Sequence, residues 1–190
     1  MPTDAAVSDA RDLTLQKIGR NVVNFQKMEA MLKFILRVAN FATPASKSQE
    51  HLETQAKLHR TKPMGHLIDL AAKALHGETP SIPKDAREIW VTHSISLSDG
   101  SQLKQWRKEF RRVVRERNAL IHRMLATWNP SSVESCHALC EELDTQRERI
   151  LPAYEHLQSI VKAIRESHEE LARNVDAIAA SEFSERPHGA

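Results

Sequence analysis

Apolar residues recur along this chain at intervals of three, four or seven positions, and polar residues fill the gaps between them. The first such segment runs from Arg11 to Phe41 and includes Leu15, Phe25 and Leu32. This spacing places the apolar side chains on one side of an α-helix. The residue before a proline avoids the helical conformation, so we expect Thr43-Pro44 to end this helix.

Shorter elements are expected in the middle of the chain. Residues 46–59 are expected to be partly helical, and residues 63–75 to form an amphipathic helix. A loop is expected at 76–83 and a short helix at 85–93. A turn at residues 98–100 follows, where Asp99 and Gln102 have the spacing of a capping box. We then expect a long helix over residues 101–125, closed by Asn129-Pro130.

The last third of the chain predicts a long helical segment. Ser131 and Glu134 have capping-box spacing at its start, and from Ile150 to Ile178 apolar residues alternate in steps of four and three. That alternation is a heptad seam, typical of helix pairing within a bundle or across a dimer. Pro152 is expected to kink or break the segment into residues 132–149 and 151–181.

These elements predict an all-α fold, an up-and-down bundle of four or five main helices with a long C-terminal helical segment. No alternating strand pattern of any length is found. We assign one helical domain to residues 11–181, with flexible termini at 1–10 and 182–190. The chain of 190 residues is 41% hydrophobic and 27% charged, which excludes general disorder and leaves room for one real core.

Composition also bears on location and on metals. No run of about eighteen apolar residues exists, and the N-terminus is polar, so we expect a cytoplasmic protein without a membrane span or secretory signal. Cys136 and Cys140 lie four apart in a helix, a poor geometry for bridging each other, so we expect both to be reduced. With His137 they offer too few ligands for a metal, and we expect neither metal nor cofactor.

The net charge of +2 conceals an uneven distribution. Residues 101–125 hold eight Lys and Arg against two Glu, whereas residues 133–185 hold twelve acids against five bases. Either the acidic last helix packs beside the basic helix and neutralises it, or the basic helix binds a polyanion, for which nucleic acid fits best. The candidate RNA contacts are Arg107, Lys108, Arg111, Arg112, Arg115 and Arg123.

The end of the basic helix holds a group of residues that could carry chemistry. Asn118 and His122 are four positions apart, so they lie on one helical face, where the amide can orient the imidazole. Arg117 occupies a position on the apolar stripe, and its planar guanidinium suits a phosphate. Histidine titrates near neutral pH and can move a proton. Glu29 lies on the apolar stripe of the first helix and needs a cationic partner if it is buried, for which we expect Arg117.

The segment Arg117-Asn118-Ala119-Leu120-Ile121-His122 resembles the Arg-Asn-x-x-x-His motif of the HEPN superfamily. The first helix, with Asn24-Phe25-Gln26, is also similar to the opening helix of many members. The resemblance implies an all-α domain and a metal-independent endoribonuclease of the toxin–antitoxin or phage-defence kind, leaving a 2′,3′-cyclic phosphate. It also implies that Arg117 and His122 are catalytic, that Asn118 positions them, and that two chains dimerise so that both motifs line one cleft. RNA and an antitoxin or regulatory protein are the expected partners.

Two other functions remain open from the sequence. In the first, Arg117 and its basic neighbours bind RNA or a nucleotide without cutting it, as in members of the family that lack activity. In the second, the heptad seam makes this a helical dimerisation or interaction protein, and Arg117 is a structural arginine. The bare spacing of an Arg and a His is a weak signal, since 190 positions supply about one instance by chance.

Overall fold

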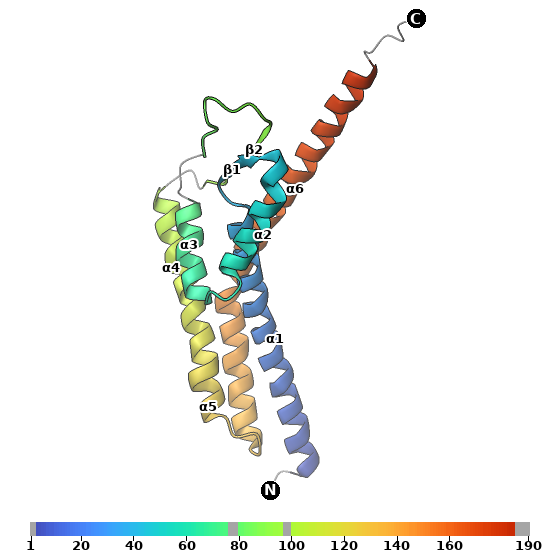
Figure 1. The fold of residues 1–190 in the computed structure, drawn as a ribbon. Coiled ribbons are helices and arrows are strands. Elements are labelled where there is room, and N and C mark those ends of the chain that lie inside the picture. The colour runs from blue at the N-terminus through green and yellow to red at the C-terminus, as the bar shows by residue number, and fades with distance from the viewer. Residues whose placement is uncertain (1–2, 76–79, 97–99, 185–190) are drawn as a thin grey trace, which may run out of the picture.

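The computed structural model describes residues 3–75, 80–96 and 100–184. Its longest helices are α1 (Asp4–Val38), α4 (Gly100–Ala119) and α6 (Val133–Ser184), which lie side by side (Figure 1). Two shorter helices cover them: α2 (Ser48–His59) contacts α1, and α3 (Met64–Ala74) contacts α1 and α4. The chain runs up, down, up, down and up through α1, α2, α3, α4 and α6 (Figure 1). The predicted all-α, up-and-down architecture is confirmed.

Helix α1 begins earlier and ends earlier than expected. It starts at Asp4, where the side chain of Thr3 accepts a hydrogen bond from the main-chain N–H of Ala6 (3.3 Å), so residues 4–10 are helical. It ends at Val38 rather than at Pro44, because Asn40 adopts a left-handed conformation with φ of 47°. The Asn40 amide donates to the Ala74 carbonyl, and its oxygen accepts from the Ile95 N–H (2.8 Å), so it ties three segments together.

A two-stranded antiparallel ribbon interrupts the helices, and the sequence analysis missed it. Strand β1 (Phe41–Pro44) pairs with β2 (Trp90–His93), and Ala45–Lys47 form one turn of 3₁₀ helix before α2. The short helix expected at residues 85–93 is therefore wrong. The ribbon is fastened to α6 by an edge-to-face contact of His93 with His168, whose ring centroids are 4.7 Å apart. Burial, and then the neighbouring His168, lower the pKa of His93.

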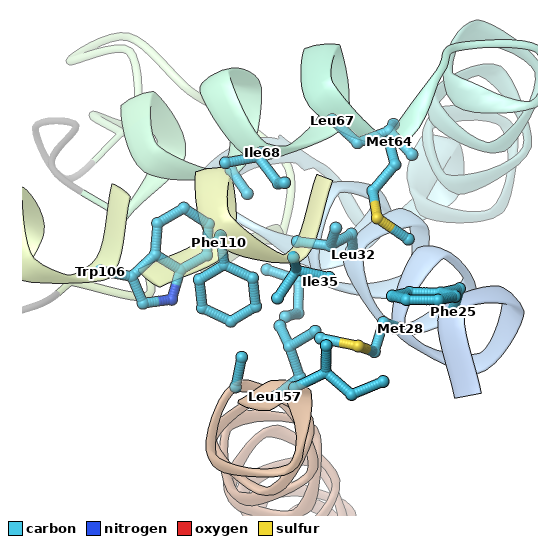
Figure 2. Packing of buried hydrophobic residues seen from close by; sticks show 14 of the residues in the cluster. Phe25, Met28, Leu32, Ile35, Met64, Leu67, Ile68, Trp106, Phe110 and Leu157 are labelled. Carbon is cyan, nitrogen blue, oxygen red and sulfur yellow. The ribbon is translucent and has the colours of Figure 1, made fainter. Parts of the chain in front are cut away.

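The core lies where α1, α3, α4 and α6 meet. Figure 2 shows Leu32 and Ile35 of α1 facing Phe110 of α4, with Ile68 of α3 and Leu157 of α6 closing the cluster. All five side chains are essentially inaccessible to water. Burial of large apolar side chains from several helices at once is the main source of stability in such a bundle. Leu15, which the sequence placed on the inner face of the first helix, is 49% exposed.

Helix α6 runs through Pro152 as one element of 52 residues, so the predicted break is wrong. Its start is capped by Ser132, not Ser131: the Ser132 hydroxyl accepts from the Ser135 N–H at 3.1 Å. Proline costs the helix a hydrogen bond at this point. The buried side chains of Ile150 and Ala153, one on each side of the proline, hold both parts against the bundle.

The heptad seam of α6 divides into two parts. Leu157, Val161 and Ile164 are buried in the chain's own core, so this part of the seam serves packing within the bundle. Beyond Ile164 the helix projects past the other helices, and Leu171 is 54% exposed (Figure 1). Residues 185–190, most of the predicted flexible C-terminus, lie outside the described residues, as do Asp99 and its predicted cap.

Both cysteines are free and buried near the N-terminal ends of α1 and α6. The Thr14 hydroxyl lies 3.3 Å from the Cys140 sulfur and 3.2 Å from the Cys136 carbonyl, and the Trp128 indole N–H donates to the Cys136 sulfur at 3.4 Å. Both sulfurs are thus enclosed by α1, by the segment before α6 and by α6 itself.

Within the described residues, no helix is both long enough and apolar enough to cross a membrane.

Candidate functional site

Helix α4 has two chemically opposite sides. Its inner side carries Leu103, Trp106, Phe110 and Val113, all buried. Its outer side carries a run of basic residues at helical spacing, which we call the basic stripe: Lys104, Arg107, Lys108, Arg111 and Arg115. They line one shallow hollow, and all except the half-buried Arg107 are exposed.

The basic stripe has few acidic partners. Arg111 lies 3.6 Å from Asp69 of α3, in a pair that is largely exposed on both sides. In the described residues no carboxylate of α6 makes an ion pair with a residue of the stripe. Among the described residues the acidic last helix therefore does not neutralise the stripe, although one basic residue of the 101–125 segment, Arg123, pairs with Glu142 of α6 at 2.6 Å. The Nε of Arg107 is buried and has no hydrogen-bond partner there.

The contacts between α4 and α6 have the opposite polarity from the one expected. Glu116 of α4 pairs with Arg149 of α6 at 3.7 Å, and Glu109 of α4 lies 3.6 Å from His156 of α6. The acids of α4 thus face inward to α6, which leaves its basic residues outward. Like charges on one face repel, so the stripe needs a partner that supplies negative charge.

The three motif residues lie at the end of the stripe. Asn118 and His122 are exposed, and Arg117 is half-buried. Nη1 of Arg117 lies 3.4 Å from Oδ1 of Asn118. The expected hydrogen bond from Asn118 to His122 is absent from the described contacts, because the Asn118 oxygen faces Arg117 and the His122 ring faces solvent.

His122 belongs to a widened turn rather than to a regular α-helix. Residues Leu120–Met124 form a π-helical segment in which the N–H of Leu125 donates to the carbonyl of Leu120, and the short helix α5 (Leu125–Thr127) follows. Leu120 and Met124 are both buried, so this turn places His122 and Arg123 on the outside. Arg123 is held there by Glu142 at 2.6 Å. Single π turns inside α-helices are frequent at functional sites.

A buried polar network supports the main chain beside this turn. The Gln146 side chain, fully buried on α6, donates to the Glu116 carbonyl of α4 at 2.8 Å. Its oxygen accepts from Nδ2 of Asn21, which also donates to the Leu143 carbonyl at 2.8 Å. Arg20 completes the chain by donating to the Asn21 oxygen at 3.2 Å. One amide pair thus fixes α1, α4 and α6 relative to one another, next to Arg117.

Asn21 and Gln146 were not among the residues predicted from the sequence. A signal existed: Thr14, Asn21, Phe25 and Met28 share one face of α1, so a polar residue stands among core positions. A polar residue at a core position must find a buried partner, and a second such residue on another helix supplies it.

Glu29 does not pair with Arg117, which corrects the prediction. Its carboxylate lies 2.7 Å from the ammonium of Lys33, one helical turn further along α1, and Lys33 also donates to the Arg60 carbonyl at 2.8 Å. Glu29, Lys33 and Arg117 nevertheless line one cavity of about 420 Å³ between α1 and α4. His122 and Asn118 are not among the residues that line it.

In the part of the chain that the structure describes, no three His, Cys, Asp or Glu side chains are grouped so that they could hold a metal ion. No protein-family model, no curated protein and no solved structure matches this chain.

Proposed function

We propose that this chain is a metal-independent endoribonuclease of the HEPN kind. The observation that carries the proposal is the alignment of the basic stripe with the motif. Lys104, Lys108, Arg111, Arg115 and Asn118 follow one another on α4 at steps of four, three, four and three, and His122 comes four further on. A single strand that follows the stripe by its phosphates therefore arrives at His122.

The proposed reaction needs only side chains of this chain. His122 accepts the proton of a ribose 2′-hydroxyl, the 2′-oxygen attacks the adjacent phosphorus, and the bond to the 5′-oxygen breaks. The leaving 5′-oxygen takes up a proton from water, so the products are a 2′,3′-cyclic phosphate and a 5′-hydroxyl, and His122 releases the proton that it accepted to the solvent. Arg117 holds the negative phosphate through its planar donors. Asn118, bonded to Arg117, positions it.

The proposal includes a homodimer. Arg117 borders the cavity between α1 and α4, whereas His122 faces solvent, so within one chain the two side chains face different surroundings. A second copy that presents its own motif across the same surface would bring an arginine and a histidine to one phosphate. We further propose that the protein acts in the cytoplasm in a toxin or defence role and that an antitoxin or regulatory protein controls it.

The test is cleavage of a single-stranded RNA in the presence of EDTA. We expect wild-type protein to cut it and leave cyclic phosphate ends, and we expect His122→Ala to lose activity by at least a hundredfold, the typical contribution of a proton-transferring side chain being about 10²–10⁴. His137→Ala is the matched control, because His137 is an exposed histidine on α6 outside the motif. Full activity in His122→Ala, or loss of activity in EDTA, would contradict the proposal.

A second candidate is binding of RNA without cleavage. It is favoured by one observation, that Asn118 bonds to Arg117 and leaves the exposed His122 ring without the orienting contact that proton transfer benefits from. Filter binding separates the two candidates. Tight, salt-sensitive binding with recovery of intact RNA after long incubation would support binding alone.

A further inference from the structure

The cavity between α1 and the end of α4 has the composition of a small-molecule site. Val22, Phe25, Leu120 and Ile121 give it apolar walls, and its polar groups come from Gln26, Glu29, Lys33 and Arg117. Its volume of about 420 Å³ falls within the range of ligand pockets, about 300–1,000 Å³. Ile121 is 41% exposed although it is apolar, so a flat ring packed on it would remove apolar surface from water.

Two charged groups stand side by side in this cavity. The ammonium of Lys33 and one carboxylate oxygen of Glu29 are 2.7 Å apart, and each side chain is about 30% exposed. The second oxygen of Glu29 has no recorded donor among the described residues. Two of the three N–H groups of the Lys33 ammonium donate to Glu29 and to the Arg60 carbonyl, which leaves one donor beside the two carboxylate oxygens, since an ammonium only donates and a carboxylate only accepts.

Of the four RNA bases, guanine has the edge that complements one donor followed by two acceptors. Its Watson–Crick edge presents the O6 acceptor, then the N1–H donor, then the N2 amino donor. Adenine and cytosine both place an amino donor where Lys33 would have to donate, and uracil places a second acceptor against the carboxylate. Proteins that read RNA sequence take unstacked bases of single strands and bond these edges.

We propose that this cavity binds a guanine base of the RNA, with Glu29 accepting from N1–H and N2 and with Lys33 donating to O6. The inference rests on the proposed function in taking RNA as the ligand, and it adds the base that the site selects. Arg117, which in the proposed function holds the phosphate that is cut, forms one wall of the cavity with Ile121, so the selected nucleotide adjoins that phosphate.

The experiment measures binding of guanosine, adenosine, cytidine and uridine 5′-monophosphates to the full chain by titration calorimetry. We expect the guanosine nucleotide to bind at least about tenfold more tightly than each of the others, since a charge-assisted pair of hydrogen bonds distinguishes it. Glu29→Gln should lower guanosine nucleotide affinity about tenfold and leave adenosine nucleotide affinity unchanged. Equal affinities for all four nucleotides, or no binding of any, would overturn the inference.

Two further variants guard against misfolding. Ala30→Trp places a bulky side chain at an exposed position of the same cavity and keeps both members of the Glu29–Lys33 pair, and it should also abolish guanosine nucleotide binding. Glu53→Gln is the matched control, because Glu53 is an exposed carboxylate on α2 that accepts a hydrogen bond from Gln49. This variant should bind the guanosine nucleotide as tightly as wild type. Selective binding that survives both Glu29→Gln and Ala30→Trp would place the nucleotide elsewhere and contradict the inference.

The same variants separate this inference from the proposed function. RNA cleavage that depends on His122 but shows no preference for guanine would refute the inference and leave the nuclease intact. Selective binding of the guanosine nucleotide by a protein that leaves RNA uncut would do the reverse.

Discussion

Two basic regions of this molecule, on α1 and on α4, differ in how their charges are met. On α1, Lys17 and Arg20 both contact Asp144 of α6, at 2.5 and 2.9 Å. On the outer side of α4, the basic stripe meets one aspartate at 3.6 Å, in a largely exposed pair. Asp144 of the last helix therefore pairs with the first helix, and among the described residues no acid of α6 pairs with the basic stripe.

The difference shows which charges the fold uses. The charges of Lys17 and Arg20 on α1 form ion pairs between helices, so a role within the fold explains them without a ligand. Apart from the exposed pair of Arg111 with Asp69, the basic stripe on α4 has no acidic partner among the described residues, so its like charges repel one another, which costs stability. Charges of that kind are the ones whose removal should affect binding much more than folding.

Removing part of the stripe should have the largest effect. We expect the triple variant Lys108→Ala, Arg111→Ala, Arg115→Ala to bind single-stranded RNA about a hundredfold more weakly at low salt. The slope of log affinity against log salt should fall by about 2, since each phosphate contact on a single strand contributes about 0.7. Fluorescence anisotropy over a salt series measures both quantities.

The matched control removes the same charge elsewhere, through Lys57→Ala, Lys73→Ala and Lys84→Ala, three exposed lysines outside α4. The free energy of unfolding of the stripe variant should stay within about 0.5 kcal/mol of wild type or rise. Equal loss of RNA affinity in the control would show that only net charge matters and would end the distinction between the two regions.

The buried amide network should give an intermediate effect, this time on folding. We expect Gln146→Ala to lower the free energy of unfolding by about 2 kcal/mol, because the Glu116 carbonyl loses its buried donor. Urea denaturation followed by circular dichroism measures it. Gln158→Ala, at an exposed glutamine of the same helix, should be neutral, and comparable losses in both variants would contradict the network's role.

Asp144→Asn should give the smallest effect, and the size of that effect depends on pH. Hydrogen bonds from Lys17 and then from Arg20 lower the pKa of this carboxyl below its usual 3.8. Its contribution is therefore complete above about pH 4 and is lost as the pH falls through the lowered value. We expect Asp144→Asn to cost under 1 kcal/mol at pH 7, since the side chain is 45% exposed, and to cost progressively less as the pH falls below about 4. Melting temperatures over that pH range test this, and a cost that is independent of pH would contradict it.

Much of the fold could be predicted from the sequence because helical periodicity is a local signal. The amphipathic helix at residues 63–75 and the inward side of α4 followed from spacing alone. The ribbon of β1 and β2 could not, since each strand has four residues and the pairing joins positions about fifty apart. Helix α6 continues through Pro152 because burial on both sides of it outweighs a local preference.

The candidate site was predictable in position but not in its contacts. The spacing of Arg117, Asn118 and His122 placed them correctly at the end of the basic helix. The π turn at 120–124, the bond from Arg117 to Asn118 and the pairing of Glu29 with Lys33 depend on how neighbouring helices pack. Lys33 lies one turn from Glu29 on the same helix, so it was a nearby alternative to Arg117 as the partner of Glu29, and the prediction from the apolar face of the first helix did not consider it.

The enclosed sulfurs of Cys136 and Cys140 make the opening of this end of the bundle measurable. A thiol reagent can reach them when α1 or the segment before α6 moves away from the start of α6, so the rate of their modification reports how often this end of the bundle opens. The buried amide pair of Asn21 and Gln146 bridges the same two helices further along. Labelling rates measured with and without RNA would therefore show whether a ligand on α4 changes how often this end of the bundle opens.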